Sequence, residues 1–398
     1  MQPLIAPRNT RLYILSQFCY ALVFTIPVWI VYYQGRISIT QISLLVALQY
    51  FFQLIFELPT GALADLIGRR STVFAGYIGW TVSILLIIGS SGFLPLVLAM
   101  LIAGLSEALL SGSLEALLYD SYKQDGNSAG FTRALATNGI VFQIGLAIAT
   151  LTGGFFYQFW QPLPYVLSAL ACAIAAILSL KFIEPAIDSQ KVTATIYLHQ
   201  MKSGLKEAFK SKTVTTMSLF YVVVSTLTWT NNLYFFDFML VELQFSDTNR
   251  SVIAGMIRIL NVSVLRAFLG NEKLFTRKRS IYFFPILMTI CFLPGIFFDG
   301  VFALPFVMGA VMAGTARWII LTRYTNELFE SKYRATAISA LSMLIGIAFV
   351  LITLVSGPII SNFGGVKMMY TILGILSLLL VVPLSLKVAS SVAKTPAS

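Results

Sequence analysis

Long hydrophobic runs, separated by short polar clusters, fill almost the whole chain. Each run is about as long as the roughly 20 residues that an α-helix needs to cross a bilayer. The first run is too long for a secretory signal and lacks a small-residue cleavage site, so it is expected to be retained as a span. The pattern predicts twelve transmembrane helices, over residues 12–33, 40–63, 72–90, 93–118, 133–157, 162–183, 213–236, 251–270, 281–298, 301–322, 335–360 and 366–386.

One long connection interrupts this series. It divides the chain into an N-terminal bundle of six helices (1–183), a linker (184–212) and a C-terminal bundle of six helices with a short tail (213–398). The two halves are nearly equal in length, which favours duplication. The predicted fold is therefore an all-α membrane protein of twelve transmembrane helices in two pseudo-symmetric six-helix bundles. Such a duplication implies a substrate path between the halves, opened to each side in turn as they rock.

The linker itself has a helical pattern. Hydrophobic residues recur at spacings of three and four, while lysines occupy the other faces. This pattern predicts an amphipathic helix on the inner leaflet, with its lysines toward anionic headgroups. The sole histidine, His199, lies in this linker rather than within a predicted span.

Composition agrees with a bilayer protein. Hydrophobic residues make up 58% of the 398 residues and charged residues 11%, and the mean hydropathy is +0.84. These values exclude a disordered chain and argue against a water-soluble protein. One polytopic domain of the inner or plasma membrane is expected, with the lipid bilayer as its surroundings.

The formal net charge of +11 would indicate nucleic acid in a soluble protein. If the N-terminus is cytoplasmic, however, 21 of the 27 basic residues fall in inner segments. The outer loops then hold three, Arg36, Arg250 and Lys367. This asymmetry follows the positive-inside rule, predicts that both termini are cytoplasmic, and removes the need for a nucleic-acid partner.

The chain offers little material for catalysis. Cys19, Cys172 and Cys291 are isolated within hydrophobic runs, so neither a metal site nor a disulfide framework is indicated. No nucleotide-binding P-loop is present, which argues against a self-contained ATP-driven pump. We expect no enzyme activity, no cofactor and no metal. A membrane-embedded lipid-modifying enzyme or a transport-dead sensor remains an alternative of another class.

The loop after the second predicted span carries the most specific motif. It reads GALADLIGRR over residues 61–70. A glycine allows close helix approach or a tight turn, and an aspartate can cap a helix N-terminus. The loop resembles the signature of the major facilitator superfamily, which implies a transporter fold and a cytoplasmic gate. The expected gating residues are Gly61, Asp65, Gly68, Arg69 and Arg70, with Asp120 as the nearest acidic partner of the arginines.

The fifth predicted span carries Gly145, Ala149, Thr150, Gly153 and Gly154. This resembles the motif of drug/proton antiporters, but Ala149 replaces a glycine and Thr150 a proline. Small residues at this spacing also suit ordinary close packing of helices. The antiporter assignment is weakened by these departures.

Ionisable residues within predicted spans are candidates for function, since burying a charge in a bilayer costs about 2.5–3.5 kcal/mol on insertion scales. Glu107 lies midway along the fourth span, Arg258 in the eighth and Arg317 in the tenth. The resemblance places spans 1, 4, 7 and 10 around the cavity, so Glu107 is expected to face Arg317 and to couple transport to protons. The alternative is a structural ion pair or a hydrogen bond between helices.

Spans 1, 4 and 7 also supply polar and aromatic residues that could line the substrate cavity. These are Gln17, Tyr20, Ser111, Trp229, Asn231, Asn232 and Tyr234. We therefore expect a monomeric secondary transporter of a small solute, with proton-coupled efflux of amphipathic organic compounds favoured. The alternative is transport of an organic anion held by Arg258 and Arg317 through forked hydrogen bonds.

Overall fold

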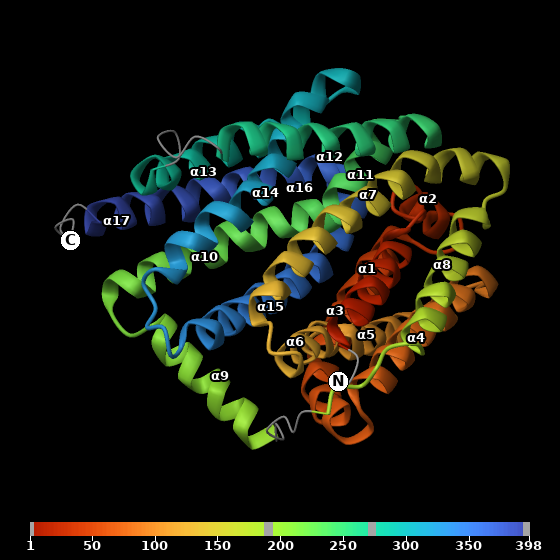
Figure 1. The fold of residues 1–398 in the computed structure, drawn as a ribbon. Helices are drawn as coiled ribbons and strands as arrows, with labels where there is room; N and C mark the ends of the chain where they lie inside the picture. Colours follow the sequence, from red (N-terminus) through yellow and green to blue (C-terminus); the bar gives the residue numbers. More distant parts are fainter. Residues whose placement is uncertain (1–3, 187–193, 270–275, 393–398) are drawn as a thin grey trace. The chain divides into compact units, whose positions relative to one another are not determined.

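The computed structural model describes residues 4–186, 194–269 and 276–392, with some side chains in these ranges left undescribed. Within those ranges the secondary structure is helical and contains no strand (Figure 1). The chain forms two compact units, and each is considered by itself. The all-helical class predicted from the sequence is confirmed.

The first unit comprises residues 1–38, 48–197 and 247–255. Its helices are α1 (Ala6–Ala21), α2 (Trp29–Gln34), most of α3 (Ile39–Ile67), α4 (Arg69–Gly89), α5 (Phe93–Leu110), α6 (Ser113–Gln124), α7 (Ser128–Phe159) and α8 (Leu163–Ser179).

The second unit comprises residues 39–47, 198–246 and 256–398. Its α-helices are α9 (Ala194–Ala208), α10 (Lys212–Thr230), α11 (Phe236–Glu242), most of α12 (Asp247–Leu269), α13 (Arg277–Phe292), α14 (Leu304–Asn326), α15 (Arg334–Asn362), α16 (Gly365–Leu376) and α17 (Val382–Val392). Shorter elements connect them: the π-helical turns η1 (Asn231–Phe235) and η4 (Ser377–Val381), and the 3₁₀ turns η2 (Gly295–Phe297) and η3 (Gly300–Ala303).

Eight helical stretches of the described chain are long and apolar enough to cross a membrane. They correspond to predicted spans 2–5 and 9–12. The other four predicted spans fall on shorter or more polar helices: α1 and α8 have 16 and 17 residues, α10 is rich in serine and threonine, and α12 carries arginines. A multi-pass membrane protein is therefore supported, while the count of twelve spans stays a prediction.

Two predicted spans are interrupted. Residues 12–33 divide into α1 and α2 because Pro27 supplies no backbone N–H, and the Phe24 N–H donates instead to Ser168 Oγ at 3.0 Å. Residues 93–118 divide into α5 and α6 at Gly112, whose φ of 77° lies in the left-handed region that glycine tolerates best. Continuous hydrophobicity could not reveal either break.

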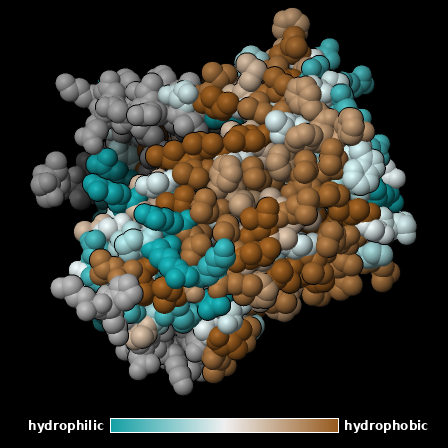
Figure 2. All heavy atoms as spheres, turned by 45° about the vertical axis from the view of Figure 1, so that its right-hand side comes forward, coloured by the Kyte–Doolittle hydropathy of each residue, from teal (hydrophilic) through white to brown (hydrophobic). Residues whose placement is uncertain are grey.

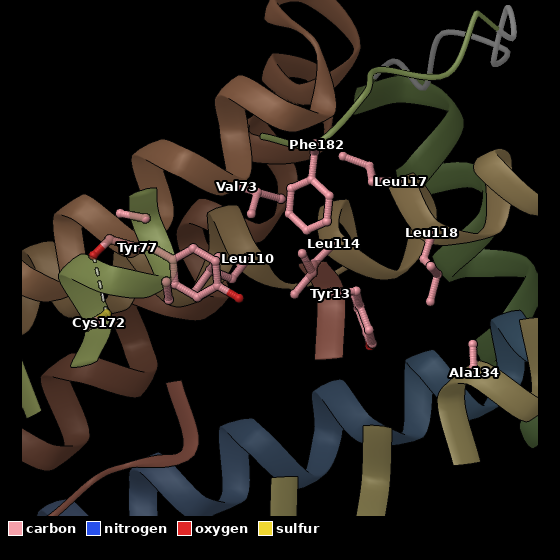
Figure 3. Close-up of a cluster of buried hydrophobic side chains, with 12 residues drawn as sticks. Tyr13, Val73, Tyr77, Leu110, Leu114, Leu117, Leu118, Ala134, Cys172 and Phe182 are labelled. Atoms are coloured by element: carbon pink, nitrogen blue, oxygen red, sulfur yellow. Dashed lines mark hydrogen bonds between the residues drawn. The ribbon is translucent and has the colours of Figure 1, made fainter. Parts of the chain in front are cut away.

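A cluster of hydrophobic side chains forms part of the core of the first unit. Figure 3 shows Tyr77, Leu110, Leu114 and Phe182 in this cluster, contributed by α4, α5, α6 and the end of the segment after α8. The Cys172 thiol contacts the Tyr77 carbonyl at 3.4 Å, which the dashed line marks. Tyr20 and Trp80 pack against the same cluster. The core therefore holds two side chains that matter for the candidate site.

Much of the surface is hydrophobic. Figure 2 shows a broad continuous field of hydrophobic residues on one face. Large apolar side chains that are strongly exposed include Leu94, Phe159 and Phe302. Such exposure is expected where a protein meets lipid tails rather than water.

The amphipathic linker helix α9 packs on the second unit. Met201 and Ala208 are buried, whereas Lys202 and Lys206 are exposed. A Cβ on Gly204 would clash with the Thr336 carbonyl at the start of α15, so only glycine allows this approach. The apolar face of α9 thus contacts protein, a partner that the prediction of an inner-leaflet helix did not include.

Candidate functional site

Glu107 on α5 is the centre of a polar cluster in the first unit. Its Oε2 accepts hydrogen bonds from the Tyr20 hydroxyl at 2.6 Å and the Trp80 Nε1–H at 3.1 Å. Tyr20 lies on α1 and Trp80 on α4, so three helices converge on one carboxylate oxygen. Tyr20 and Glu107 were both predicted to take part in transport, and the structure brings them together.

Small residues allow this convergence. A Cβ on Gly79 would clash with Ser106 Oγ, and one on Gly76 would lie 2.7 Å from Leu110 Cγ. Helices α4 and α5 therefore approach closely where these glycines face Ser106 and Leu110. Trp80 follows Gly79 and Glu107 follows Ser106, so this contact brings the indole beside the carboxylate.

Aromatic packing fixes the donor side chains. The Tyr20 ring centroid lies 5.7 Å from that of Tyr77 and 6.2 Å from that of Trp80, the latter edge-on. Tyr77 is fully buried. Offset or edge-to-face aromatic pairs of this kind are favourable and restrict rotamers. The hydroxyl and indole N–H are consequently held toward Glu107.

The predicted gate motif is partly visible. Gly68 has a φ of 88° and joins α3 to α4, as expected of a tight turn. Arg69 forms an ion pair with Asp120, the partner expected from sequence, and both side chains are largely buried. Gly61 and Asp65 lie in α3, but their surroundings fall outside the described part of the structure. The gating role of the motif remains a prediction.

Glu184, which sequence reasoning missed, caps α4. Its two carboxylate oxygens accept the backbone N–H groups of Arg69 and Arg70, each at 2.7 Å. A carboxylate here satisfies orphan donors and interacts favourably with the helix dipole. The sequence offered no signal, because Glu184 follows the sixth predicted span and lies 115 residues from Arg69.

Glu184→Ala is expected to destabilise the protein by about 0.5–2 kcal/mol, the usual effect of losing a helix cap. The apparent melting temperature of purified protein would measure this. Glu184→Gln retains an acceptor oxygen and should lose less. Equal melting temperatures for the wild type and the alanine variant would contradict the capping role.

In the second unit, the predicted cavity residues of span 7 form a π-helical turn. The Phe236 N–H donates to the Asn231 carbonyl, five residues back, and so widens the helix at η1. Asn231 Nδ2 donates to Asn232 Oδ1 at 3.0 Å, and Asn232 Nδ2 donates to the Val311 carbonyl at 3.3 Å. Asn231 is fully buried, and its Oδ1 has no hydrogen-bond partner. Turns of this type are frequent at functional sites.

Arg317 on α14 is buried beside α10. It interacts with the Tyr221 hydroxyl, which also lies 3.4 Å from Thr322 Oγ1. The Arg317 guanidinium carbon is 5.3 Å from the ring centroid of Trp318. Its Nε–H is buried and has no hydrogen-bond partner within the part of the chain that the structure describes. A buried guanidinium with an unused donor is suited to an anionic group.

Arg258 on α12 resembles Arg317 in the state of its Nε–H donor. Its Nε–H is also buried without a hydrogen-bond partner. Asp237, in the first turn of α11, is buried and interacts electrostatically with Arg258. In the described part of the second unit, Arg258 and Arg317 thus each have a buried Nε–H that lacks a partner.

The other predicted cavity residues differ in their surroundings. Trp229 packs against Phe349, with ring centroids 5.2 Å apart. Tyr234 is fully buried and its hydroxyl bonds to Ser43. Gln17 is half-buried, and Ser111 is exposed at the break between α5 and α6. Their role in binding a substrate remains a prediction.

A metal is not indicated by the described side chains. Among the residues that the structure describes, no group of three or more His, Cys, Asp or Glu is placed to hold a metal ion. All three cysteines are free. The candidate site therefore consists of charged and amide side chains carried by helices.

Comparison with known proteins decides the family. The family model of the Major Facilitator Superfamily matches residues 12–316. The chain belongs to this superfamily. The resemblance read from residues 61–70 is therefore confirmed, and the protein is a member of a transporter family rather than a family of enzymes.

Individual relatives of this superfamily member are distant. It is 28% identical over 143 residues to a tetracycline resistance protein, class H, from Pasteurella multocida. That match covers 36% of this chain, and the chain spans about a third (34%) of the relative. Its fold is similar to the nucleoside transporter NupG, with a TM-score of 0.75, 14% identity, and coverage of 99% of this chain and 100% of the other. It is also similar to the POT family transporter PepTSo, with a TM-score of 0.74, 10% identity, and coverage of 98% and 99%.

In this superfamily member, Glu107 belongs to the first unit and Arg317 to the second. The partners described for each residue lie within its own unit: Tyr20 and Trp80 for Glu107, and Tyr221 for Arg317. The predicted pairing of Glu107 with Arg317 therefore remains a hypothesis. Sequence reasoning missed Trp80 and Tyr221, since aromatic residues are common filler in apolar helices.

Proposed function

We propose that the protein is a secondary active transporter that moves a small solute by alternating access, coupled to protons. The observation that carries this proposal is the Glu107 cluster. A carboxyl group is expensive within a bilayer and usually marks an ion or substrate pathway. Here it is half-buried and is held by hydrogen bonds from α1 and α4.

The cluster has the chemistry of a two-state switch. Tyr20 and Trp80 both donate a hydrogen bond to Glu107 Oε2. A proton on Glu107 would remove the charge and weaken both hydrogen bonds. Because the two donors lie on different helices, protonation would loosen the link between α1, α4 and α5. We propose that this change couples proton binding to the motion of helices.

Efflux of amphipathic organic compounds is the favoured transport mode. It is supported by the partial likeness to a tetracycline resistance protein and by the resemblance of span 5 to the antiporter motif. The departures at Ala149 and Thr150 weigh against a copy of the antiporter mechanism. We further propose that the transporter is a monomer of the inner or plasma membrane with both termini in the cytoplasm.

A proteoliposome screen tests this proposal. Purified protein would be reconstituted and offered cationic, neutral and anionic solutes, with and without a pH gradient. Flux of an amphipathic cation or neutral compound that responds to the gradient is the expected result. Flux of a solute that ignores the gradient would contradict proton coupling. Ligand-dependent conformational change without any flux would instead favour a sensor.

An organic anion is the second candidate substrate. The observation in its favour is that Arg258 and Arg317 each bury an Nε–H for which the described residues supply no hydrogen-bond partner. A buried unsatisfied donor is costly, particularly on a charged group. A carboxylate or phosphate on the substrate would accept these hydrogen bonds.

For this candidate, Arg317→Gln is expected to weaken binding of anionic solutes about ten- to hundredfold, as the loss of a hydrogen bond to a charged group implies. Binding of neutral solutes should change little. Arg317→Lys restores the charge without the planar fork and should recover only part of the affinity. Arg323→Gln, at an exposed arginine of the same helix, is the matched control. Equal losses for neutral and anionic solutes would contradict anion recognition.

A further inference from the structure

Three tyrosines from three helices form a buried cluster in the first unit. Tyr32 lies on α2, Tyr157 near the end of α7 and Tyr165 near the start of α8. Their exposed fractions are 0%, 5% and 2%. The Tyr32 ring centroid lies 4.1 Å from that of Tyr165 and 6.4 Å from that of Tyr157. Figure 1 labels the three helices that bring them together.

The hydroxyls of Tyr32 and Tyr165 lack a hydrogen-bond partner among the described residues. Both are buried, and neither has a hydrogen-bond partner of ordinary geometry in that part of the chain, although the Arg36 side chain acts on the Tyr32 hydroxyl. A buried unpaired hydroxyl costs about 1–3 kcal/mol, and native structures rarely leave one so. Phenylalanine would fill the same space without that cost. Two such hydroxyls on neighbouring rings therefore point to a bound group near them.

Two arginines lie near the tyrosines. The Arg36 guanidinium carbon lies 3.7 Å from the ring centroid of Tyr32, and Arg36 Nη1 donates to the Tyr32 carbonyl at 2.8 Å. Arg250 is buried, donates from Nε to the Pro27 carbonyl at 3.4 Å, and pairs with Asp247. Arg36, Arg250 and Asp247 all act electrostatically on Tyr157. Among the described residues, the charged groups that act on Tyr157 are these two guanidinium groups and one carboxylate, a net charge of about +1.

The location of these arginines is unusual. Sequence topology places only three basic residues in outer segments, and Arg36 and Arg250 are two of them. Basic residues in outer segments run against the positive-inside rule, so another function should account for them. Their meeting at one tyrosine cluster supplies such a reason, because both contribute to a field that attracts an anion.

We propose that Tyr32, Tyr165 and Arg36 form a binding site for a small monovalent anion. Tyrosine hydroxyls and guanidinium N–H groups can all donate, and the excess positive charge repels a cation. A halide accepts hydrogen bonds from several directions and fits between aromatic side chains. The site shares no residue with the Glu107 cluster and so does not depend on the proposed coupling mechanism. Chloride is the expected occupant.

The test uses purified full-length protein and its apparent melting temperature. Chloride would replace gluconate at constant ionic strength and pH. We expect the melting temperature to rise with chloride and to saturate, because a ligand that binds the folded state stabilises it by mass action. A parallel titration with formate separates a halide from a carboxylate. Saturation by either anion supports the site, and saturation by neither overturns it.

Two variants make the test specific. Tyr32→Phe and Tyr165→Phe should each raise the chloride concentration at half-effect at least about tenfold, since each removes a hydrogen bond to an anion. In gluconate their melting temperatures should equal or exceed that of the wild type, because phenylalanine leaves no hydroxyl unpaired. Tyr370→Phe is the matched control: Tyr370 in the second unit is fully buried and its hydroxyl lacks a partner among the described residues, but the charged group that acts on it is the Asp237 carboxylate, which repels an anion. This variant should keep the full response to chloride.

Other outcomes would overturn the proposal. If both cluster variants keep the wild-type response to chloride, the hydroxyls do not contact the anion. If both lose the same stability in chloride and in gluconate, the hydroxyls serve a structural hydrogen bond, such as one to water. An identical shift in the Tyr370→Phe control would show a general salt effect.

Discussion

Glu107→Gln is expected to reduce flux driven by a pH gradient to that of protein-free liposomes. Glutamine keeps the size of the side chain and an oxygen that can accept from Tyr20 and Trp80, but it cannot exchange a proton. Substrate binding should therefore survive while coupling is lost. Substrate binding by titration and flux in proteoliposomes, measured on the same preparation, separate the two effects.

The matched control for this variant is Glu115→Gln. Glu115 lies in the first turn of α6 and is exposed. Its replacement should leave the driven flux unchanged. Tyr20→Phe removes one of two donors to Glu107 and should lower the flux only in part, with a change in its pH dependence. Wild-type dependence on the pH gradient in Glu107→Gln would exclude Glu107 as the proton carrier.

Asp120→Asn is expected to reduce transport strongly at normal levels of membrane insertion. The side chains of Arg69 and Asp120 are 16% and 12% exposed, so the neutral asparagine would leave a largely buried guanidinium without its counter-charge. Breaking a fully buried ion pair costs about 3–5 kcal/mol, and this pair should approach the lower value. The start of α4 would lose its attachment to α6, and the loop that carries the family motif would lose its shape.

Exchanging the two charges tests whether the ion pair itself matters or only the charge at either position. The double variant Arg69→Asp with Asp120→Arg restores opposite charges and should recover part of the stability and flux that either single variant loses. Arg70→Gln is the control, since Arg70 is exposed in the same turn and its loss should have little effect on stability. No recovery in the double variant, together with normal transport in Asp120→Asn, would contradict a role for the pair.

Hydrophobic pattern alone predicted the helical class, the membrane and most helix positions. α15, for example, runs over Arg334–Asn362 where residues 335–360 were expected. This success has a simple cause: transfer into a bilayer depends on the composition of about 20 consecutive residues, which the sequence displays directly. Helix ends and breaks were less accessible, because the interruption at Pro27 depends in part on Ser168, far along the chain.

The candidate site could be predicted only in part. Glu107 stands out in sequence because a carboxylate is costly within an apolar run, and Arg69 stands out through its motif. Their partners do not stand out. The Trp80 indole is one aromatic group among many, and Glu184 is one of several acids near helix ends. What selects them is contact across helices, which no local pattern encodes.

By itself the sequence determined that this protein is helical, lies in a membrane and carries the loop motif of a transporter superfamily, because each of these properties resides in a continuous stretch of chain. The tertiary structure decided which side chains are joined by a hydrogen bond or an ion pair, and which carboxylate caps a helix. Tyr20 reaches Glu107 from 87 residues away, and Arg250 comes near Tyr157 from another helix. Close packing between helices sets these distances, and it becomes apparent only once the chain has folded.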